Sequence, residues 1–258
     1  MSISLSNVTV ELPIFSANAR SLRKRLTPTA VGGSLMSRGD NKVIIRALNN
    51  VSLKIKDGER VALIGPNGAG KTTLLKVLSG VYAPTRGNVA ISGEVSSALN
   101  TSLGLDVELT GRENIYLLGY YRGISRPVIT KALEDIIETA ELGQFIDLPV
   151  NTYSAGMQGR LTFAVATAFE PDILIMDEWL AAGDSRFVAK ASERTARFVS
   201  KARILILASH SLAIVRNFCS HAAFLNSGSL VTYGPVEDVI SAYEHQLNAP
   251  SPPVAATA

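Results

Sequence analysis

The chain has 258 residues, of which 47% are hydrophobic and 18% are charged, and its formal net charge is +3. This length suffices for one large α/β domain or two small ones with a buried core. No apolar run reaches the roughly 18 residues of a membrane-spanning helix, and the weak positive charge does not by itself indicate nucleic-acid binding.

The N-terminus and the cysteine usage give two further expectations. Residues 1 to 15 lack the basic head and long apolar stretch of a secretory signal, so we expect the chain to reside in the cytosol. Cys219 is the only cysteine, which excludes an internal disulfide and a cysteine-based metal cluster. We expect its side chain to be small, apolar and buried.

Strand patterns dominate the first part of the chain. Residues 5 to 12 alternate in polarity, and residues 42 to 55 predict a strand, a turn and a second strand. The apolar residues 60 to 65 predict a buried strand. A Gly-rich loop joins this strand to a predicted helix that Gly80 ends.

A basic insertion, residues 16 to 43, separates the first two strand patterns. The only acid in this part of the chain is Asp40. Its basic residues are Arg20, Arg23, Lys24, Arg25, Arg38, Lys42 and Arg46. The segment is either a solvated loop or a surface that faces anionic lipid headgroups or a partner.

The middle of the chain has three helix patterns. Thr110 and Glu113 fit a capping box at the start of the first. Ser125 can cap the second, and Ser154 can cap a third that runs to about Phe169. The apolar residues of the second helix follow helical spacing: Ile129, Leu133, Ile136, Ile137 and Ala140.

The last third alternates strands with helices. The predicted strands are residues 172 to 178, 203 to 209, 221 to 227 and 228 to 234. The predicted helices are residues 186 to 201, 211 to 218 and 235 to 247. Such alternation predicts a mostly parallel sheet that helices cover on both faces.

The strongest motif is GPNGAGKT, which matches G-x-x-x-x-G-K-[ST] between a predicted strand and a predicted helix. Its glycines let backbone N–H groups surround a phosphate, while Lys71 reaches the β- and γ-phosphates and Thr72 offers a hydroxyl to Mg²⁺. A Gly-rich turn without a ligand is the alternative. The candidate phosphate-binding residues are Gly65, Pro66, Asn67, Gly68, Ala69, Gly70, Lys71, Thr72 and Thr73.

Three further side chains follow predicted strands, where ligands gather in open α/β sheets. We expect Asp177 to hold Mg²⁺ through water and Glu178 to accept a proton from the attacking water. His210 is a candidate for a γ-phosphate contact in catalysis. The alternatives are a solvated pair of acids and a structural histidine.

The motifs GPNGAGKT, TYSAGM, ILIMDE and AAGD, followed by His210, occur in this order along the chain. In this arrangement the sequence resembles the nucleotide-binding subunit of ABC transporters, from about residue 5 to residue 245. In that family the corresponding segments are the Walker A loop, the signature motif, the Walker B strand, the D-loop and the switch histidine.

The resemblance implies a P-loop NTPase (RecA-like) fold, in which a mostly parallel sheet core accompanies an antiparallel β subdomain and a helical subdomain. Residues 1–258 would form a single ABC ATPase domain. Residues 1–99 and 165–245 would make the core with its β subdomain, and residues 100–164 the helical subdomain with the signature motif. The Pro/Ala-rich residues 246–258 would be a disordered tail.

The resemblance also implies ATP and Mg²⁺ as cofactors and a head-to-tail homodimer that encloses two ATP molecules. Ser154 and Gly156 would contact the γ-phosphate held by the other subunit, and Asp184 would line the interface. Exposed amides at a helix start carry about half a positive charge, which suits an anion. Phe15 is a candidate for stacking on adenine, with a plain core aromatic as the alternative.

The signature segment departs from the usual Leu-Ser-Gly-Gly-Gln, with Tyr153 before the serine, Ala155 for the usual glycine and Met157 for the usual glutamine. With DEWLAAGD and ELTGRENIYL, this variant looks like the subfamily that exports polysaccharides such as O-antigen, capsule and teichoic acid. The usual Q-loop glutamine is not found near Asn100 and Thr101. The residue that couples to a membrane subunit therefore stays open.

The resemblance implies the ATP-binding subunit of an exporter for a polysaccharide or lipid-linked glycan. We expect an ABC-2-type transmembrane permease that handles the glycan, a peripheral location on the cytoplasmic face of the bacterial inner membrane, and no nucleic-acid partner. Two alternatives remain: a transporter ATPase for other cargo, and a non-transport ABC ATPase. The latter usually carries a coiled-coil insertion or tandem cassettes, which the sequence does not suggest.

Overall fold

The structure is a computed structural model that describes residues 1–14, 34–38, 42–97, 104–178 and 185–248. Its contacts divide the chain into two compact units. The sheet unit comprises Ser2–Ile91 and Leu207–Ala258, and the helical unit comprises Met1 and Ser92–Ile206. The domain boundaries expected from the sequence stay a prediction.

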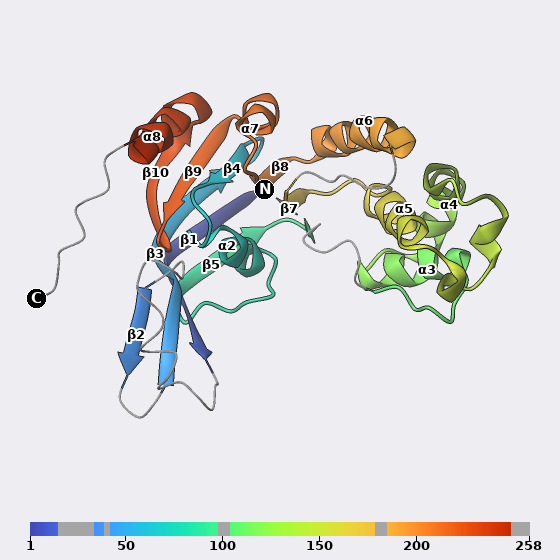
Figure 1. The fold of residues 1–258 in the computed structure, drawn as a ribbon, viewed down its shortest axis with the longest axis horizontal. Helices are drawn as coiled ribbons and strands as arrows, with labels where there is room; N and C mark the ends of the chain where they lie inside the picture. Colours follow the sequence, from blue (N-terminus) through green and yellow to red (C-terminus); the bar gives the residue numbers. More distant parts are fainter. Residues whose placement is uncertain (15–33, 39–41, 98–103, 179–184, 249–258) are drawn as a thin grey trace, which may run out of the picture. The chain divides into compact units, whose positions relative to one another are not determined.

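The sheet unit contains a four-stranded sheet in the order β2-β3-β1-β5 (Figure 1). Its strands are β1 (Ser2–Ile14), β2 (Ser34–Arg38), β3 (Lys42–Lys56) and β5 (Arg86–Ser92). β3 pairs antiparallel with β1 and with β2. The buried face of this sheet includes Val8, Leu48 and Val51, so the predicted alternation of apolar residues places them in the core.

The turn predicted within residues 42 to 55 is wrong, because β3 runs unbroken through this range. Asn50 has a φ of 54°, and Asn7 on β1 has a φ of 52°. The register of β1 against β3 shifts on both sides of Val8. Asparagine adopts left-handed backbone more readily than most residues, so the chain accommodates Asn7 and Asn50 within irregular strands without turning.

The sheet unit also contains part of a mixed sheet, in which β9 lies between β4 and β10. Its strands are β4 (Arg60–Ile64), β9 (His221–Asn226) and β10 (Ser229–Pro235). β4 runs parallel to β9, and β10 runs antiparallel to it. The parallel strands β4 and β9 are almost wholly buried, as a strand covered on both faces should be.

Three helices of the sheet unit accompany these strands: α2 (Lys71–Leu78), α7 (Leu212–Phe218) and α8 (Val236–Asn248). Gly80, with a φ of 72°, follows α2 as predicted. α8 packs against β9 (Figure 1). The rings of Tyr243 and Phe224 at this contact are 5.1 Å apart. Cys219 is buried as expected, and burial raises the pKa of its thiol to about 12.

The helical unit contains the helices α3 (Gly111–Tyr121), α4 (Arg126–Ala140), α5 (Ala155–Ala166) and α6 (Ser185–Lys201). Two short 3-10 helices, η1 (Gly143–Asp147) and η2 (Val150–Thr152), lie between α4 and α5. β6 (Val95–Ser97) pairs parallel with β7 (Ile173–Asp177), and β8 (Ile204–Ala208) crosses the boundary between the units. The structure therefore has the mixed α/β composition that the sequence predicts.

All three helices start where the sequence predicts, and two of the three predicted cap residues form a capping hydrogen bond. Thr110 and Glu113 form the predicted capping box at the start of α3. Ser154 caps α5, with its Oγ accepting from the Met157 N–H at 3.2 Å. Ser125 stands at the N-cap of α4, but its side chain makes no capping hydrogen bond.

The predicted apolar stripe of α4 faces the core of the helical unit. Ile129, Ile136 and Ala140 are buried, and Leu133 and Ile137 pack partly buried against the same cluster. α5 ends at Ala166, three residues earlier than predicted, with Thr167 as its C-cap.

None of the helices within the described ranges is both long and apolar enough to span a lipid bilayer.

A substitution at Gly87 tests how closely β5 packs against β1. It has a φ of +85°, and a Cβ added to it would lie 2.3 Å from the Asn7 carbonyl oxygen. We expect Gly87→Ala to lower the free energy of unfolding by about 3 kcal/mol, through both backbone strain and the clash. Urea denaturation of the purified chain measures this loss.

Gly58→Ala is the matched control, because Gly58 has a φ of +81° but no atom within 4 Å of its added Cβ. This variant should lose only the cost of the left-handed backbone, about 1 kcal/mol. Equal losses in the two variants would show that the Asn7 carbonyl does not restrict position 87.

Candidate functional site

The predicted phosphate-binding loop connects β4 to α2, and only glycines fit at two of its positions. Gly65 has a φ of 144°, and a Cβ there would lie 2.1 Å from the Leu225 carbonyl oxygen. Gly70 has a φ of 104°, and a Cβ there would lie 2.8 Å from the Ala47 carbonyl oxygen. The glycines of the motif are therefore required by the strands β9 and β3 that press against the loop.

Hydrogen bonds to the neighbouring backbone hold this loop in place. The Gly228 N–H donates to the Ala69 carbonyl at 3.0 Å, and the Asn49 N–H donates in turn to the Gly228 carbonyl at 2.8 Å. Within the loop, the Ala69 N–H donates to the Pro66 carbonyl at 3.1 Å. These hydrogen bonds fix the curved shape of the loop.

Lys71 lies across the loop and is only 8% exposed. Its ammonium donates to the carbonyls of Gly65 at 2.7 Å and Pro66 at 3.1 Å. Pro66, Asn67 and Gly68 are exposed. The buried ammonium and the exposed loop crest together form a site for an anion.

The start of α2 adds to this charge. Thr72 is exposed and Thr73 half-buried in the first turn of the helix. No acidic residue occupies that turn and no side chain caps it. The positive end of the helix dipole at this turn therefore favours a phosphate.

The predicted acids lie at the end of β7 in the helical unit. Ile173 to Met176 are buried, Asp177 is half-buried and Glu178 is exposed. Glu178 has a φ of 74°, a left-handed conformation that costs a residue with a side chain on the order of 1 kcal/mol. Strain of this kind gathers at functional sites, which is in line with a catalytic role for this residue.

His210 follows β8 in the sheet unit and is exposed. The residues on both sides of it are fixed, since the Ser211 N–H donates to Ser209 Oγ at 3.2 Å. Ser211 also caps α7. The histidine is therefore presented at the end of a strand, where the sequence places it.

The start of α5 is the second candidate anion site. Ser154, Ala155 and Gly156 are exposed, and the N–H groups of Ala155 and Gly156 have no acceptor within the helix. A Cβ added to Gly156 would meet only Ser154 Oγ, at 3.8 Å. The packing of this chain does not require the glycine, which leaves room for a group that approaches from outside.

Tyr153 anchors this helix start, a role that the sequence analysis missed. It is 7% exposed, and its hydroxyl donates to the Phe145 carbonyl at 2.5 Å. Burial raises the pKa of the phenol. Gly111 makes room for it, because a Cβ there would lie 2.3 Å from the Tyr153 hydroxyl. No local pattern in the sequence signals the contact between Gly111 and Tyr153, because these residues are 42 positions apart.

Several predicted residues lie outside the described residues: Phe15, Asn100, Thr101, Asp184 and most of the basic insertion. Of the basic residues near that insertion, Arg46 pairs with Glu11 at 2.9 Å. Its charge is therefore balanced within the sheet unit.

Thr72 and Asp177 offer the oxygen ligands that Mg²⁺ prefers. Within the described ranges, no group of three or more His, Cys, Asp or Glu side chains is placed to hold a metal ion. Thr72 lies in the sheet unit and Asp177 in the helical unit, and their assignment as Mg²⁺ ligands stays a prediction.

The comparisons with known proteins agree with this site. A protein-family model described as ABC transporter matches residues 48–181. The O-antigen export system ATP-binding protein RfbE of Yersinia enterocolitica is 37% identical over 227 residues, 88% of this chain and 95% of that protein. The teichoic acids export ATP-binding protein TagH of Lactococcus lactis is 42% identical over 208 residues, 81% of this chain but 44% of that protein.

Among solved structures, a dimeric ATP-binding cassette in a post-hydrolysis state with ADP and Pi superposes with a TM-score of 0.64. It is 23% identical and covers 91% of this chain and 98% of its own. This likeness confirms the expected α/β P-loop NTPase fold. From the family match and the identity to RfbE, the chain belongs to the ABC transporter family and is one of its ATP-binding, ATP-hydrolysing subunits.

Proposed function

We propose that this chain drives the export of a polysaccharide or lipid-linked glycan by hydrolysing ATP, as a homodimer bound to a separate transmembrane subunit. The names of its relatives, which refer to O-antigen and teichoic acid export, support this cargo class. The observation that carries the proposed mechanism is the exposed, serine-capped start of α5. A phosphate-binding loop is common to many enzymes, whereas a second anion-binding helix start suits a nucleotide held by another copy.

In this mechanism the sheet unit binds the triphosphate. The N–H groups of residues 65–73 surround the β- and γ-phosphates, and Lys71 moves its ammonium from the loop carbonyls onto them. Thr72 and Asp177 would hold Mg²⁺, which when bound offsets the charge that develops on the phosphates.

Glu178 then acts as the general base. Its carboxylate accepts a proton from the water that attacks the γ-phosphorus, the bond to the β-phosphate oxygen breaks, and ADP and phosphate result. His210 donates a hydrogen bond to the γ-phosphate and helps to fix it. The side chains of Glu178 and His210 are both exposed, so both are accessible to a bound nucleotide.

A second copy of the chain completes each site. Ser154 Oγ and the N–H groups of Ala155 and Gly156 bind the γ-phosphate held by the partner, in a head-to-tail dimer that encloses two ATP molecules. ATP favours this closed dimer, and its hydrolysis returns the dimer to the open state. The dimeric cassette among the structural neighbours supports such an assembly.

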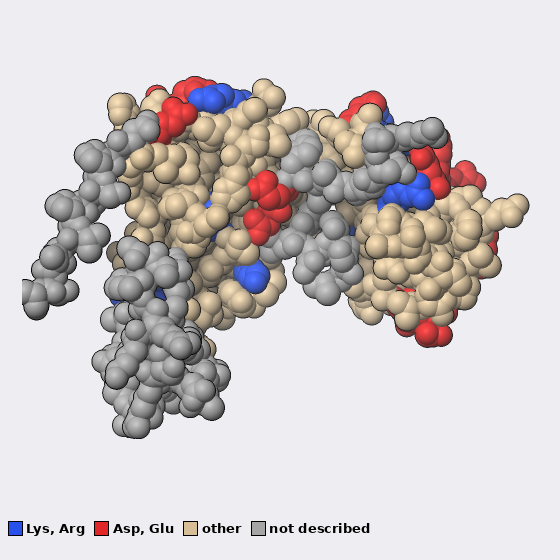
Figure 2. All heavy atoms as spheres, in the orientation of Figure 1, with Lys and Arg blue, Asp and Glu red and all other residues tan. Residues whose placement is uncertain are grey.

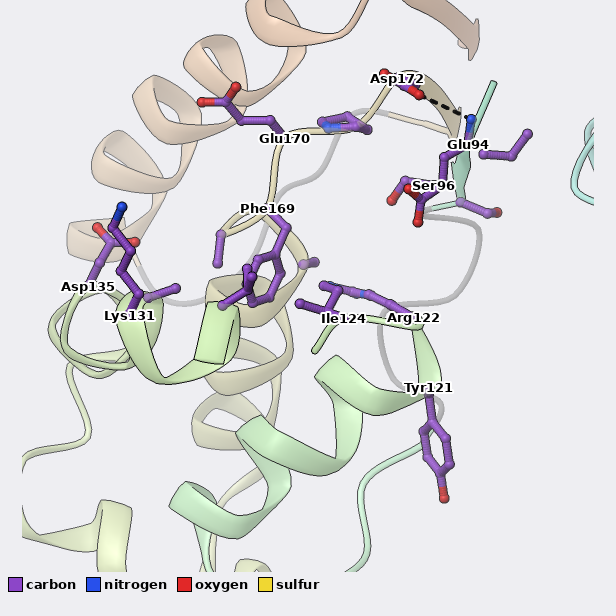
Figure 3. Close-up of a pocket in the computed structure, with 17 residues that line it drawn as sticks. Glu94, Ser96, Tyr121, Arg122, Ile124, Lys131, Asp135, Phe169, Glu170 and Asp172 are labelled. Carbon is purple, nitrogen blue, oxygen red and sulfur yellow. Dashed lines mark hydrogen bonds between the residues drawn. The ribbon is translucent and has the colours of Figure 1, made fainter. Parts of the chain in front are cut away.

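The transmembrane partner is of the ABC-2 permease type, and the dimer binds it at the cytoplasmic face of the inner membrane. The helical unit offers a place for it in a pocket of about 950 Å³ (Figure 3). Ser96 and Ser97 line this pocket just before the segment expected to couple to the membrane subunit. The exposed Tyr121 and the half-buried Phe169 supply apolar surface for a cytoplasmic segment of the permease.

A transporter ATPase for other cargo and a non-transport ABC ATPase are the competing functions. On the face that Figure 2 shows, both basic and acidic side chains lie on each of the two units. The export-system names of the relatives favour the transport function. Purification in detergent distinguishes these functions, since an integral membrane protein should accompany an exporter ATPase and nucleic acid should accompany the non-transport alternative.

Replacing Glu178 by glutamine tests the base. Glu178→Gln should bind ATP with unchanged affinity, lose at least about 100-fold in turnover, and accumulate as an ATP-bound dimer. Phosphate release and size-exclusion chromatography measure these effects. Glu138→Gln, which changes another exposed carboxylate of the helical unit, is the control and should retain turnover. Unchanged steady-state hydrolysis in Glu178→Gln would contradict the assignment.

Lys71→Met tests the phosphate-binding loop. Removing the ammonium while keeping its apolar stem should weaken ATP binding about 100-fold, because a buried charge pair is lost. Lys76→Met is the matched control on the same helix, where the ammonium lies 5.3 Å from the Tyr82 ring centroid. Titration of the monomer with a fluorescent ATP analogue measures both affinities. Equal ATP affinities of the Lys71→Met and Lys76→Met variants would show that Lys71 does not contact the nucleotide.

Gly156→Ala tests the second anion site. The added methyl meets only Ser154 Oγ at 3.8 Å. The free energy of unfolding should therefore stay the same or rise by up to about 1 kcal/mol. Turnover should fall about tenfold, because the methyl occupies the approach to the N–H groups.

Gly159→Ala is the control for this change, since its Cβ would also enter open space, one turn further from the helix start. It should hydrolyse ATP at the rate of the unchanged protein. The same turnover in both alanine variants would argue against a phosphate contact at Gly156.

A further inference from the structure

The signature helix α5 is exposed at one end and enclosed at the other. Its first residues, Ala155 and Gly156, face solvent, whereas the seven residues from Leu161 to Thr167 are all buried. Tyr153 fixes the chain just before this exposed start, so the direction of the helix depends on what holds its other end. The contacts around Val165 and Thr167 therefore help to decide where Ser154 points.

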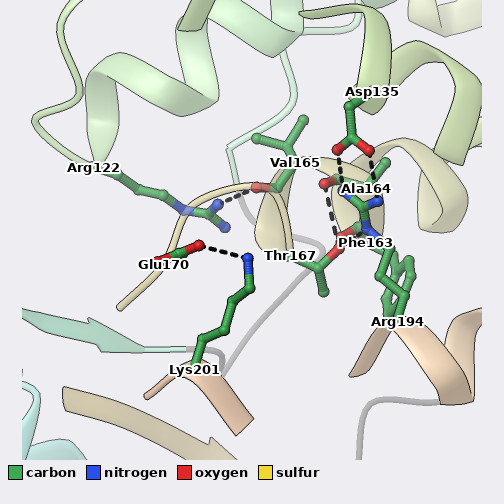
Figure 4. A network of polar contacts seen from close by, with 9 residues as sticks. All are labelled: Arg122, Asp135, Phe163, Ala164, Val165, Thr167, Glu170, Arg194 and Lys201. Carbon is green, nitrogen blue, oxygen red and sulfur yellow. Dashed lines mark hydrogen bonds and ion pairs between the residues drawn. The ribbon is translucent and has the colours of Figure 1, made fainter. Parts of the chain in front are cut away.

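Arg122, which ends α3, makes the first of these contacts. Its Nη1 donates to the Val165 carbonyl at 2.7 Å (Figure 4). Burial lowers the pKa of this guanidinium from its usual value, which lies far above neutral pH, so it stays charged. A cation at the C-terminal end of a helix satisfies a terminal carbonyl and stabilises the helix dipole.

Arg194 of α6 makes the second contact and connects three helices. Its Nε donates to Thr167 Oγ1 at 2.8 Å, and its Nη1 and Nη2 donate to the two oxygens of Asp135 at 3.1 and 2.6 Å (Figure 4). The Thr167 hydroxyl in turn donates a hydrogen bond to the Phe163 carbonyl at 2.9 Å. The hydrogen bond from Arg194 lowers the pKa of the Asp135 carboxyl, which stays ionised and keeps the pair intact.

Aromatic packing fixes the same two helices closer to the start of α6. The rings of Phe163 and Phe187 meet edge to face at 5.6 Å, and the Arg160 guanidinium lies 6.0 Å from the Phe187 ring centroid. With Arg194, α6 therefore holds α5 at two places. Two attachments along one helix fix its direction as well as its position.

We propose that Arg194 is a positioning residue for ATP hydrolysis, which sets the direction of α5 and thereby the place where Ser154 and Gly156 meet the terminal phosphate. The 12 residues of α5 span about 18 Å, so a tilt of about 3° at the fastened end displaces the helix start by about 1 Å. A displacement of this size in a catalytic group can cost about 100-fold in rate. This inference rests on the proposed function of Ser154 and Gly156.

The test is a double-mutant cycle of Arg194→Met and Thr167→Val in the full chain. Steady-state hydrolysis gives kcat and KM, nucleotide titration gives the ATP affinity of the monomer, and thermal unfolding verifies that each variant is folded at the assay temperature. Arg197→Met is the matched control, because Arg197 lies on the same helix and its guanidinium donates to Glu193, at 3.0 Å, and not to Thr167 or Asp135.

We expect Arg194→Met to lower kcat about tenfold or more while KM and the monomer's ATP affinity change less than about twofold. Thr167→Val should lower kcat in part, and the double variant should match Arg194→Met, since both changes break one contact. Arg194→Lys, which keeps the charge but loses the forked geometry, should recover part of kcat. Arg197→Met should hydrolyse ATP normally.

Several results would overturn the inference. A kcat for Arg194→Met within about twofold of the unchanged protein would show that the contact does not set the helix direction, and so would single effects that multiply fully in the double variant. If Arg194→Met does not fold, the single variants Thr167→Val and Arg194→Lys take its place. A kcat within about twofold of the unchanged protein in both of them would then overturn the inference. If the unchanged protein itself did not hydrolyse ATP, the proposed function would be refuted, and the inference with it.

Discussion

The phosphate-binding part of this protein depends on the absence of two side chains. The carbonyl oxygens of Leu225 and Ala47 lie so close to the loop that a Cβ at Gly65 or Gly70 would meet them at 2.1 and 2.8 Å. The strands can press on the loop only because these positions are glycine. The loop in turn keeps its N–H groups in one arrangement, which needs little reorganisation when an anion binds.

The start of α5 offers N–H groups to an anion by the opposite construction. The phosphate loop is held along its length by β3 and β9, whereas Ser154 stands at an exposed helix start that is anchored from behind by Tyr153 and from the far end by Arg194. A site that must meet a ligand carried by another molecule has to be open in front. Its precision therefore comes from contacts behind it.

Features that depend on neighbours in sequence were predictable, and features that depend on the fold were not. The phosphate motif in its strand-loop-helix context and the Thr110 capping box follow from local pattern. The left-handed backbone of Asn50 and Glu178 does not, because a strand or turn pattern carries no φ. The contact of Arg194 with Thr167 joins residues 27 positions apart, and only the packing of α6 on α5 reveals it.

The capping groups at the start of α3 differ from those at the starts of α2 and α5. In α3, Thr110 and Glu113 satisfy each other's backbone N–H groups, and the Glu113 carboxylate adds a negative charge at the helix start. α2 and α5 have no acid in the first turn, and Ser154 occupies only the N–H of Met157. Neither helix start carries a side-chain negative charge that would offset the positive end of its dipole. In α5, the two arginines at the opposite end stabilise the helix without adding a cap that would compete with the phosphate.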